Sequence, residues 1–172
     1  RRAMRKLKVL VVGAGGREHA LAWAIARSPS VGAVHAAPGN PGIGELAALR
    51  PVAAGDLEGL EGLVAEEGYD LVVVGPEQPL AEGLADRLRA RGAAVFGPDR
   101  AAARLESSKA FAKDFMRRHG HPTADHVTVA GPAEARARLR AWGAPIVVKA
   151  SGLAAGKGVI LARTDAEALD AI

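Results

Sequence analysis

A short apolar strand that ends in a glycine-rich turn and continues as a helix constrains the fold of this chain more than any other feature. Lys8–Val12 is a short apolar run of the kind that forms a strand buried on both faces. Gly13–Gly16 interrupts it, and Arg17–Arg27 follows with the apolar spacing of a helix. This order predicts parallel strands covered by helices, because a parallel strand pair needs a long crossover connection.

The strand–turn–helix order recurs over residues 4–98. Apolar runs of strand length stop at glycine or proline, and stretches with helical spacing follow them. We therefore expect an α/β domain with a doubly wound, right-handed parallel sheet of the Rossmann-like type. The further strands are expected at Val31–Ala36, Asp70–Val74 and Ala94–Phe96, a loop at Pro38–Gly42, and helices from a capping Asp56 to Glu67 and over Leu80–Arg91.

The pattern changes after residue 98. Residues 99–122 are expected to form a helical connection, and residues 123–172 a second unit that mixes strands and helices. Its last helix opens with a capping box at Thr164–Glu167 and has only begun at Ile172, so we expect the second unit to be incomplete. The elements expected here are helices at Arg100–Leu105, Ser108–His119 and Pro132–Trp142, and strands at Ala124–Val129, Ile146–Ala150 and Val159–Ala162.

Composition and charge exclude several classes of protein. None of the 172 residues is cysteine, which excludes disulfides and thiolate metal sites and agrees with a cytoplasmic location. No apolar run approaches the roughly 20 residues that cross a bilayer. The net charge of +4 falls to +2 without Arg1 and Arg2, because we expect Arg1–Ala3, before Met4, to be a cloning remnant. Acidic and basic residues alternate along the helices, so we expect no nucleic-acid partner, and we expect no membrane partner either. The chain is also expected to be a monomer.

The first glycine-rich turn, Gly13–Gly16, lies where open parallel sheets bind ligands, between the carboxyl end of a strand and the beginning of a helix. Backbone N–H groups and the helix dipole favour an anion there, and Arg17 adds a guanidinium suited to a phosphate or carboxylate. The dinucleotide fingerprint G-x-G-x-x-G fails, because Glu18 stands at its third glycine and Ala36 and Ala37 stand where an acidic residue is needed. On this motif alone, an anion site and close helix–strand packing are equally supported.

A second glycine-rich segment, Gly152–Gly158, lies between two predicted strands. It is not a Walker A loop, because Gly158 replaces the required Ser or Thr and Ser151 stands where the first glycine should be. A glycine hairpin with Lys149 before it and Lys157 within it can fold over a polyphosphate. A plain surface turn is the alternative, but a lysine at the end of an apolar strand is costly without an anion, which favours the phosphate site.

Two further loops are expected at the same edge of the sheet as Arg17. Gly75-Pro76-Glu77 and Pro38-Gly39-Asn40 each follow a predicted parallel strand, and parallel strands end at one edge. Lys109, near the start of a helix, has by itself the pattern of a solvated side chain. No metal site is assigned, because the histidines show no metal-ligand spacing; they are His19, His35, His119, His121 and His126.

Together these motifs resemble those of the phosphoribosylamine–glycine ligase family, which belongs to the ATP-grasp superfamily. The resemblance covers Met4–Ile172, with the motifs in the family's order. Ser107 and Ser151 depart from it, because the family usually has Gly and Asp at these positions. The matching segments are Val11–Ala20, Ala37–Asn40, Gly75–Leu80, Leu105–Phe111 and Val148–Val159.

The resemblance implies an ATP-dependent ligase of purine biosynthesis. ATP, with magnesium or manganese, would convert the carboxylate of glycine to glycyl phosphate. The amine of 5-phosphoribosylamine would then attack it to give glycinamide ribonucleotide, ADP and phosphate. Residues 4–98 would be the pre-ATP-grasp domain that holds phosphoribosylamine, and residues 123–172 the first part of an α+β ATP-grasp small subdomain. Family members continue further, so we expect this piece alone to be inactive, with its glycine site and metal ligands outside it.

The resemblance also implies binding residues, although no catalytic residue and no metal ligand is assigned in this piece. Two alternatives remain: another ATP-grasp ligase that joins a carboxylate to an amine, and a non-catalytic module that binds a nucleotide or a phosphosugar. The residues implied to bind phosphoribosylamine are Gly15, Gly16, Arg17, Glu18, Pro38, Gly39, Asn40, Gly75, Pro76 and Glu77, and those implied to bind ATP are Lys109, Lys149, Gly152, Ala154, Ala155, Gly156, Lys157 and Gly158.

Overall fold

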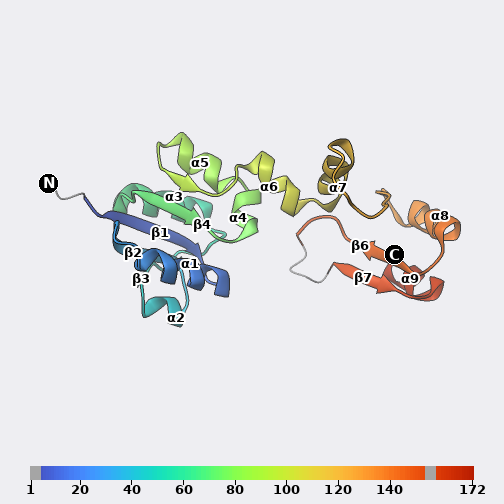
Figure 1. The fold of residues 1–172 in the computed structure, drawn as a ribbon, viewed down its shortest axis with the longest axis horizontal. Helices are drawn as coiled ribbons and strands as arrows, with labels where there is room; N and C mark the ends of the chain where they lie inside the picture. The colour runs from blue at the N-terminus through green and yellow to red at the C-terminus, as the bar shows by residue number, and fades with distance from the viewer. Residues whose placement is uncertain (1–4, 154–157) are drawn as a thin grey trace. The chain divides into compact units, whose positions relative to one another are not determined.

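The computed structural model describes residues 5–153 and 158–172, in two compact units (Figure 1). The first unit ends at Ala103 and the second begins at Arg104. The expectations for Arg1–Met4 and for Ala154–Lys157 lie outside the described residues. Among the helices of the described ranges, none combines the length and the apolar character needed to cross a membrane.

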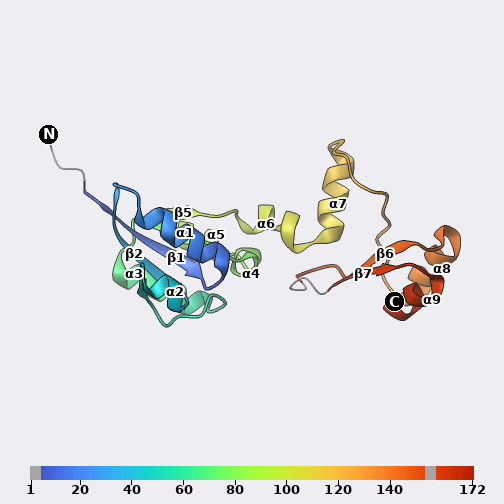
Figure 2. The same cartoon turned by 60° about the horizontal axis from the view of Figure 1, so that its bottom comes forward.

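The first unit is built on a five-stranded parallel sheet in the order β3-β2-β1-β4-β5. Helices cover both faces of the sheet, which confirms the expected doubly wound α/β architecture (Figures 1 and 2). Its strands are β1 (Leu7–Gly13), β2 (Val31–Pro38), β3 (Ala48–Leu49), β4 (Leu71–Val74) and β5 (Val95–Phe96), and its helices are α1 (Gly16–Ala26), α2 (Pro41–Gly44), α3 (Leu57–Glu67), α4 (Glu77–Ala81) and α5 (Leu84–Ala90).

The central strand β1 supplies side chains to the cores on both faces of the sheet. Val9 and Val11 pack in the cluster that includes α1 and α2, whereas Leu10 and Val12 pack in the cluster that includes α3 and α5. All four side chains are at most 1% exposed. Each contributes roughly 1.5–3 kcal/mol by its burial, so the continuous apolar run of β1 holds both helical layers against the sheet.

The ends of α3 follow the expected signals, whereas the single helix expected over Leu80–Arg91 is wrong. The Oδ1 of Asp56 accepts a hydrogen bond from the backbone N–H of Gly59 at 2.9 Å, and Gly68 ends α3. The segment expected to be one helix over Leu80–Arg91 is divided between two helices, α4 and α5, because the chain turns at Gly83 with a φ of 93°. Glycine adopts this left-handed conformation without the steric cost that a β-carbon brings.

Two short elements of the first unit have no counterpart in the sequence analysis. The helix α2 begins at Pro41, inside the segment expected to be a loop, and the Oδ1 of Asn40 caps it by accepting from the backbone N–H of Ile43 at 2.9 Å. The edge strand β3 has only two residues, both exposed, and pairs with His35 and Ala36 of β2. Elements this short carry no periodic apolar pattern, because one or two side chains cannot define a face.

The second unit centres on an antiparallel pair of strands. Ile146 lies opposite Ala162, and Lys149 lies opposite Val159. Helix α6 (Arg100–Ser107) spans the division between the units. The small buried cluster of the second unit contains Leu139, Ala162 and Ala168. Its other elements are α7 (Lys109–Arg118), α8 (Pro132–Trp142), β6 (Ile146–Lys149), β7 (Val159–Ala162) and α9 (Asp165–Ala171).

The strand expected at Ala124–Val129 is wrong. This segment lies wholly within the described part of the chain and carries no strand pairing there, since β6 pairs with β7 alone among the described strands. Alternation of apolar and polar residues favours an extended backbone, but a β-strand also needs a hydrogen-bonded neighbour. The other helices and strands expected in this unit are confirmed, including the cap of α9, where the Oγ1 of Thr164 accepts from the backbone N–H of Glu167 at 3.2 Å.

Candidate functional site

Three loops of the first unit lie side by side at the carboxyl edge of its sheet, as the parallel order requires. They follow β1, β2 and β4, which are neighbours in the sheet. Backbone hydrogen bonds join them: the N–H of Gly39 donates to the carbonyl oxygen of Gly13 at 3.1 Å, and that of Gly75 donates to the oxygen of Val12 at 3.1 Å. The side-chain amide of Asn40 adds a bond from its Nδ2 to the carbonyl oxygen of Ala14 at 2.8 Å. This edge is the place where open α/β sheets bind ligands.

Arg17 carries the positive charge of this edge. It is the second residue of α1, and its side chain is 60% exposed. Its Nε donates to the Oε1 of Glu18 at 2.9 Å, and its Nη2 donates to the Oε2 of Glu77 at 3.2 Å. These two carboxylates, Glu18 first, raise the pKa of the Arg17 guanidinium. The guanidinium is therefore charged at every physiological pH and tied to two of the three loops.

Glu77 lies at the start of α4, opposite the glycine-rich turn. Its own backbone N–H first and the guanidinium of Arg17 second lower the pKa of the Glu77 carboxyl. The side chain is 44% exposed, so a ligand at this edge can reach the carboxylate. A carboxylate and a guanidinium side by side give this edge acceptors as well as donors.

Glu18 is a buried acid beneath the same loops. The residue is 4% exposed, and its Oε2 accepts from the backbone N–H of Gly15 at 2.7 Å. Its side chain fills the space that a β-carbon at Gly13 or at Gly75 would need. These glycines therefore allow the Glu18 side chain to pass between the ends of β1 and β4.

The ten residues implied to bind phosphoribosylamine gather at this edge, but they are not equally open to a ligand. Gly15, Gly16 and Arg17 are exposed. In contrast, both polar atoms of the Asn40 side chain bond to the protein, one to Ala14 and one at the cap of α2. Pro38 ends β2, Gly39 follows it, and Pro76 precedes α4, so these three shape the loops through their backbone.

A second candidate site lies in the second unit, between the start of α7 and the hairpin that joins β6 and β7. Lys109 is the first residue of α7, where the hydroxyl of Ser108 caps the helix. The Nζ of Lys109 donates to the carbonyl oxygen of Gly152 at 2.9 Å. The backbone N–H of Ala150 donates to the oxygen of Gly158 at 2.9 Å and closes the hairpin. The local sequence pattern predicted a solvated side chain for Lys109. In the structure it is bonded to the glycine segment 43 residues away.

Lys149 lies at the end of β6, where its side chain is exposed. The expectation that Lys149 is costly without an anion is therefore wrong, because water solvates its ammonium group. On the same face of the hairpin, Val147, Val159 and Leu161 are 44%, 50% and 61% exposed. We call these three side chains the apolar strip. They were not among the predicted site residues, although the alternation of side chains along β6 and β7 assigns them to the face of Lys149.

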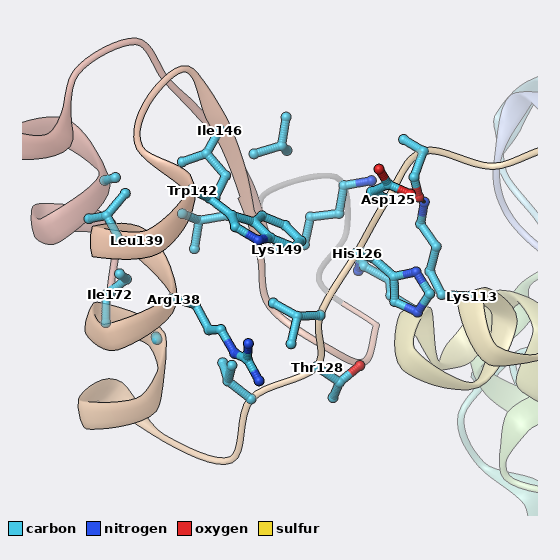
Figure 3. A pocket seen from close by; sticks show the side chains of 18 of the residues that line it. Lys113, Asp125, His126, Thr128, Arg138, Leu139, Trp142, Ile146, Lys149 and Ile172 are labelled. Atoms are coloured by element: carbon cyan, nitrogen blue, oxygen red, sulfur yellow. Dashed lines mark hydrogen bonds between the residues drawn. The ribbon is translucent and has the colours of Figure 1, made fainter. Parts of the chain in front are cut away.

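A cavity of about 660 Å³ lies beside this hairpin (Figure 3). Its wall from α8 and β6 includes the apolar side chains of Leu139, Trp142 and Ile146. Figure 3 shows the basic side chains of Arg138 and Lys149 at the same cavity. Apolar walls with a few basic groups suit an amphipathic anion such as a nucleotide. Within residues 5–153 and 158–172, no group of three or more His, Asp or Glu side chains lies close enough to hold a metal ion.

Comparisons with known proteins match both units. Residues 7–106 match the family model described as phosphoribosylglycinamide synthetase, N domain, and residues 107–172 match that of its ATP-grasp (A) domain. Phosphoribosylamine–glycine ligases from Ralstonia nicotianae and Caulobacter vibrioides are each 57% identical to this chain, over 96% and 98% of its length. The chain spans 39% of the length of each of these relatives.

Solved structures agree with the fold. The chain is similar to the crystal structure of a phosphoribosylamine–glycine ligase from Thermotoga maritima, with a TM-score of 0.75 and 34% identity, over 95% of this chain and 38% of that one. It is also similar to an N5-carboxyaminoimidazole ribonucleotide synthetase from Thermus thermophilus, with a TM-score of 0.73 and 27% identity, over 94% of this chain and 42% of that one. The two family models together match residues 7–172 in order, so the chain belongs to the phosphoribosylglycinamide synthetase family.

Proposed function

We propose that this chain supplies the phosphoribosylamine-binding loops and the ATP-binding hairpin of a ligase that forms glycinamide ribonucleotide. In this reaction the carboxylate of glycine attacks the γ-phosphorus of ATP, ADP leaves, and glycyl phosphate forms. The amine of 5-phosphoribosylamine attacks the carbonyl carbon, and phosphate leaves. The observation that carries the proposal is the Arg17 guanidinium, which is held at one edge by Glu18 and Glu77 and exposed beside the start of α1.

The first unit provides a site for the phosphate of the phosphosugar. Arg17 is the second residue of α1, so its exposed side chain starts at the helix end that carries the positive dipole charge and the first backbone N–H groups. Arg17 and the loop donors would bind the phosphate, and the Glu77 carboxylate would accept from hydroxyl or amine hydrogens of the sugar. A monophosphate fits better than a dinucleotide, because the Glu18 side chain occupies the place of the third fingerprint glycine.

The second unit provides a site for the nucleotide. Lys109 and Lys149 would pair with phosphate oxygens, and the apolar strip would contact the adenine. The family resemblance also implies that ATP contacts the rest of the glycine segment, Ala154–Gly158. A divalent cation such as magnesium would accompany ATP, but the described residues offer no cluster that fits it, so it needs ligands elsewhere. The described residues contribute charge and positioning, and none of them acts as a nucleophile.

We also propose the domain division of the sequence analysis. Residues 4–98 form the phosphosugar-binding domain, residues 99–122 connect it to the next, and residues 123–172 begin the ATP-grasp domain. The compact units that divide after Ala103 and the family models that meet after residue 106 support a boundary within this helical connection.

Calorimetric titration with ribose 5-phosphate tests the phosphosugar site. Arg17→Ala should weaken binding about ten- to hundredfold, because charge-assisted hydrogen bonds contribute about 1.5–3 kcal/mol. Arg27→Ala is the matched control, because Arg27 stacks on Trp23 beyond the other end of α1. Ribose without phosphate should bind the wild-type chain only weakly. Equal affinity of wild type and Arg17→Ala would refute the assignment.

Titration with ATP tests the nucleotide site. Lys149→Ala should weaken binding about tenfold or more, because the variant loses a charge-assisted contact with phosphate. Lys6→Ala removes a lysine of the first unit and should leave the affinity unchanged. A Lys149→Ala variant that binds ATP as tightly as wild type would show that the glycine segment is only a turn.

A further inference from the structure

Glu18 is the one residue of the first loop that breaks the dinucleotide fingerprint, and its side chain is buried. The side chain is 5% exposed, and its two carboxylate oxygens have different partners. The Oε2 accepts from the backbone N–H of Gly15, at the cap of α1, and the Oε1 accepts from the Nε of Arg17. A carboxylate so enclosed has almost no surface open to a ligand.

The contact with Glu18 fixes one edge of the Arg17 guanidinium. A guanidinium has five N–H donors, and in the described structure Glu18 and Glu77 take one each. The described contacts leave three donors on a side chain that is 60% exposed. The guanidinium is thus oriented before a ligand arrives, so binding does not include the entropy cost of ordering this side chain.

We propose that Glu18 is a positioning residue of the phosphosugar site, which acts through Arg17 and does not touch the substrate. This inference rests on the proposed function, because it needs Arg17 to bind the phosphate. It replaces the direct substrate contact that the family resemblance implies for Glu18. Two effects of the Glu18 carboxylate oppose each other: it orients the guanidinium, and its negative charge repels the phosphate. Orientation outweighs repulsion, because the carboxylate is already paired with Arg17 and with the N–H of Gly15.

Glu18→Gln separates this role from a structural one. A glutamine keeps the volume and can still accept from the N–H of Gly15, since capping boxes use Gln as well as Glu. Its amide NH₂ cannot accept from the Nε of Arg17. Ribose 5-phosphate should therefore bind Glu18→Gln about fivefold more weakly, at a thermal midpoint close to that of wild type. Glu18→Ala should lose both affinity and stability, because the cap and the packing against Gly75 disappear.

A double-mutant cycle then decides between positioning and direct contact. In an Arg17→Ala background, followed by NMR titration into the millimolar range, Glu18→Gln should cause no further loss. An equal loss in both backgrounds would mean that Glu18 itself contacts the phosphosugar, and this would overturn the proposal. So would unchanged or tighter binding by the single Glu18→Gln variant, because repulsion would then dominate.

A readout without ligand keeps the two hypotheses distinguishable. The Nε–H of Arg17 should exchange with solvent more slowly in wild type than in Glu18→Gln, because the carboxylate protects it. If the wild-type chain does not bind ribose 5-phosphate, the proposed function fails, while slow exchange would still show that Glu18 orients Arg17. Equal exchange rates in the two proteins would overturn the positioning role, whatever the binding result.

Discussion

At the scale of single residues, the carboxyl edge of the sheet depends on one buried side chain, that of Glu18, and on two glycines that leave room for it. The Glu18 side chain lies where β-carbons at Gly13 and Gly75 would stand. Gly75 is 57 positions from Glu18 in the sequence. The two loops can approach each other only while position 75 stays glycine, because the buried carboxylate cannot move outward without breaking its bond to Gly15.

Gly75→Ala should therefore destabilise the chain by roughly 1–3 kcal/mol, as overpacking does in a filled site. Urea denaturation checks this value. Gly62→Ala is the matched control: its β-carbon meets nothing within 4 Å inside α3, so it should stabilise the chain by about 0.5–1 kcal/mol. In a Glu18→Ala background most of the cost of Gly75→Ala should disappear. A cost that persists there would locate the strain in the backbone of the loop.

At the scale of elements, a charged cluster joins the end of α3 to β1 and β2. The carboxylate of Glu67 accepts from the Nζ of Lys8 at 2.5 Å and from the Nε of Arg50 at 2.9 Å. These contacts, Lys8 first, lower the pKa of Glu67 to about 2. Beside them, His35 is buried and its Nδ1 lies 2.8 Å from the hydroxyl of Tyr69. Burial first, and then the charges of Arg50 and Lys8, lower the pKa of His35.

This cluster predicts that the first unit loses stability in acid. Both pKa values are lower in the folded chain than in the unfolded one, so the unfolded chain binds more protons as the pH falls. The contribution of His35 is complete above its ordinary pKa of 6.5 and decreases below it. That of Glu67 is complete above 4.5 and is lost as the pH falls towards about 2.

Denaturation of variants across this pH range measures the two contributions. His35→Gln should remove the dependence just below pH 6.5, because glutamine keeps a partner for Tyr69 but does not titrate. Glu67→Gln should reduce the dependence below pH 4.5. If both variants keep the wild-type profile, other carboxylates are responsible for the acid sensitivity.

The elements also show where local patterns mislead. The apolar spacing over Leu80–Arg91 is helical on both sides of Gly83, and only the left-handed turn at that glycine separates α4 from α5. A glycine within a helical pattern is tolerated often enough that the sequence alone does not distinguish a break from an interior position. At Ala124–Val129 the alternation of apolar and polar residues predicted a strand that is not formed. Alternation is a local property of the sequence, whereas pairing with a second strand is not.

At the scale of the whole molecule, the two units differ in how much apolar surface they bury. The first unit has two clusters on the faces of its sheet, with β1 common to both. In the described part of the second unit, the buried cluster consists of Leu139, Ala162 and Ala168. Since burial of apolar area is the main favourable term, the first unit should be the more stable of the two.

Hydrogen exchange followed by mass spectrometry tests this difference. The amides of β1 and β4 should exchange much more slowly than those of β6 and β7, because the second unit opens at a lower free energy. Leu139→Ala should accelerate exchange in β6 and β7 but not in β1, and Leu10→Ala should do the reverse, each at a cost of about 2–5 kcal/mol. Equal protection of the two units, or acceleration of both by either variant, would contradict separate opening.

The sequence by itself determined the order of the longer strands and helices and several of the places where they begin and end, but not the break at Gly83 or the short elements α2 and β3. The apolar run of β1, the cap at Asp56 and the cap at Thr164 act within a few residues, so they can be read without knowing the fold. The same holds for the positions of the two glycine-rich segments, whose composition allows the backbone to approach an anion closely. These parts of the fold and of the candidate site follow from periodicity and from local hydrogen bonding.

Only the tertiary structure decided which side chains meet. The bond of Arg17 to Glu77 spans 60 residues and that of Lys109 to Gly152 spans 43, and no local pattern encodes either. In the sequence, Glu18 was only the residue that breaks the dinucleotide fingerprint. The structure shows that it is a buried carboxylate bonded to Arg17. The physical reason is that local spacing fixes which face of an element is buried, whereas the sheet order and the loop contacts fix what that face touches.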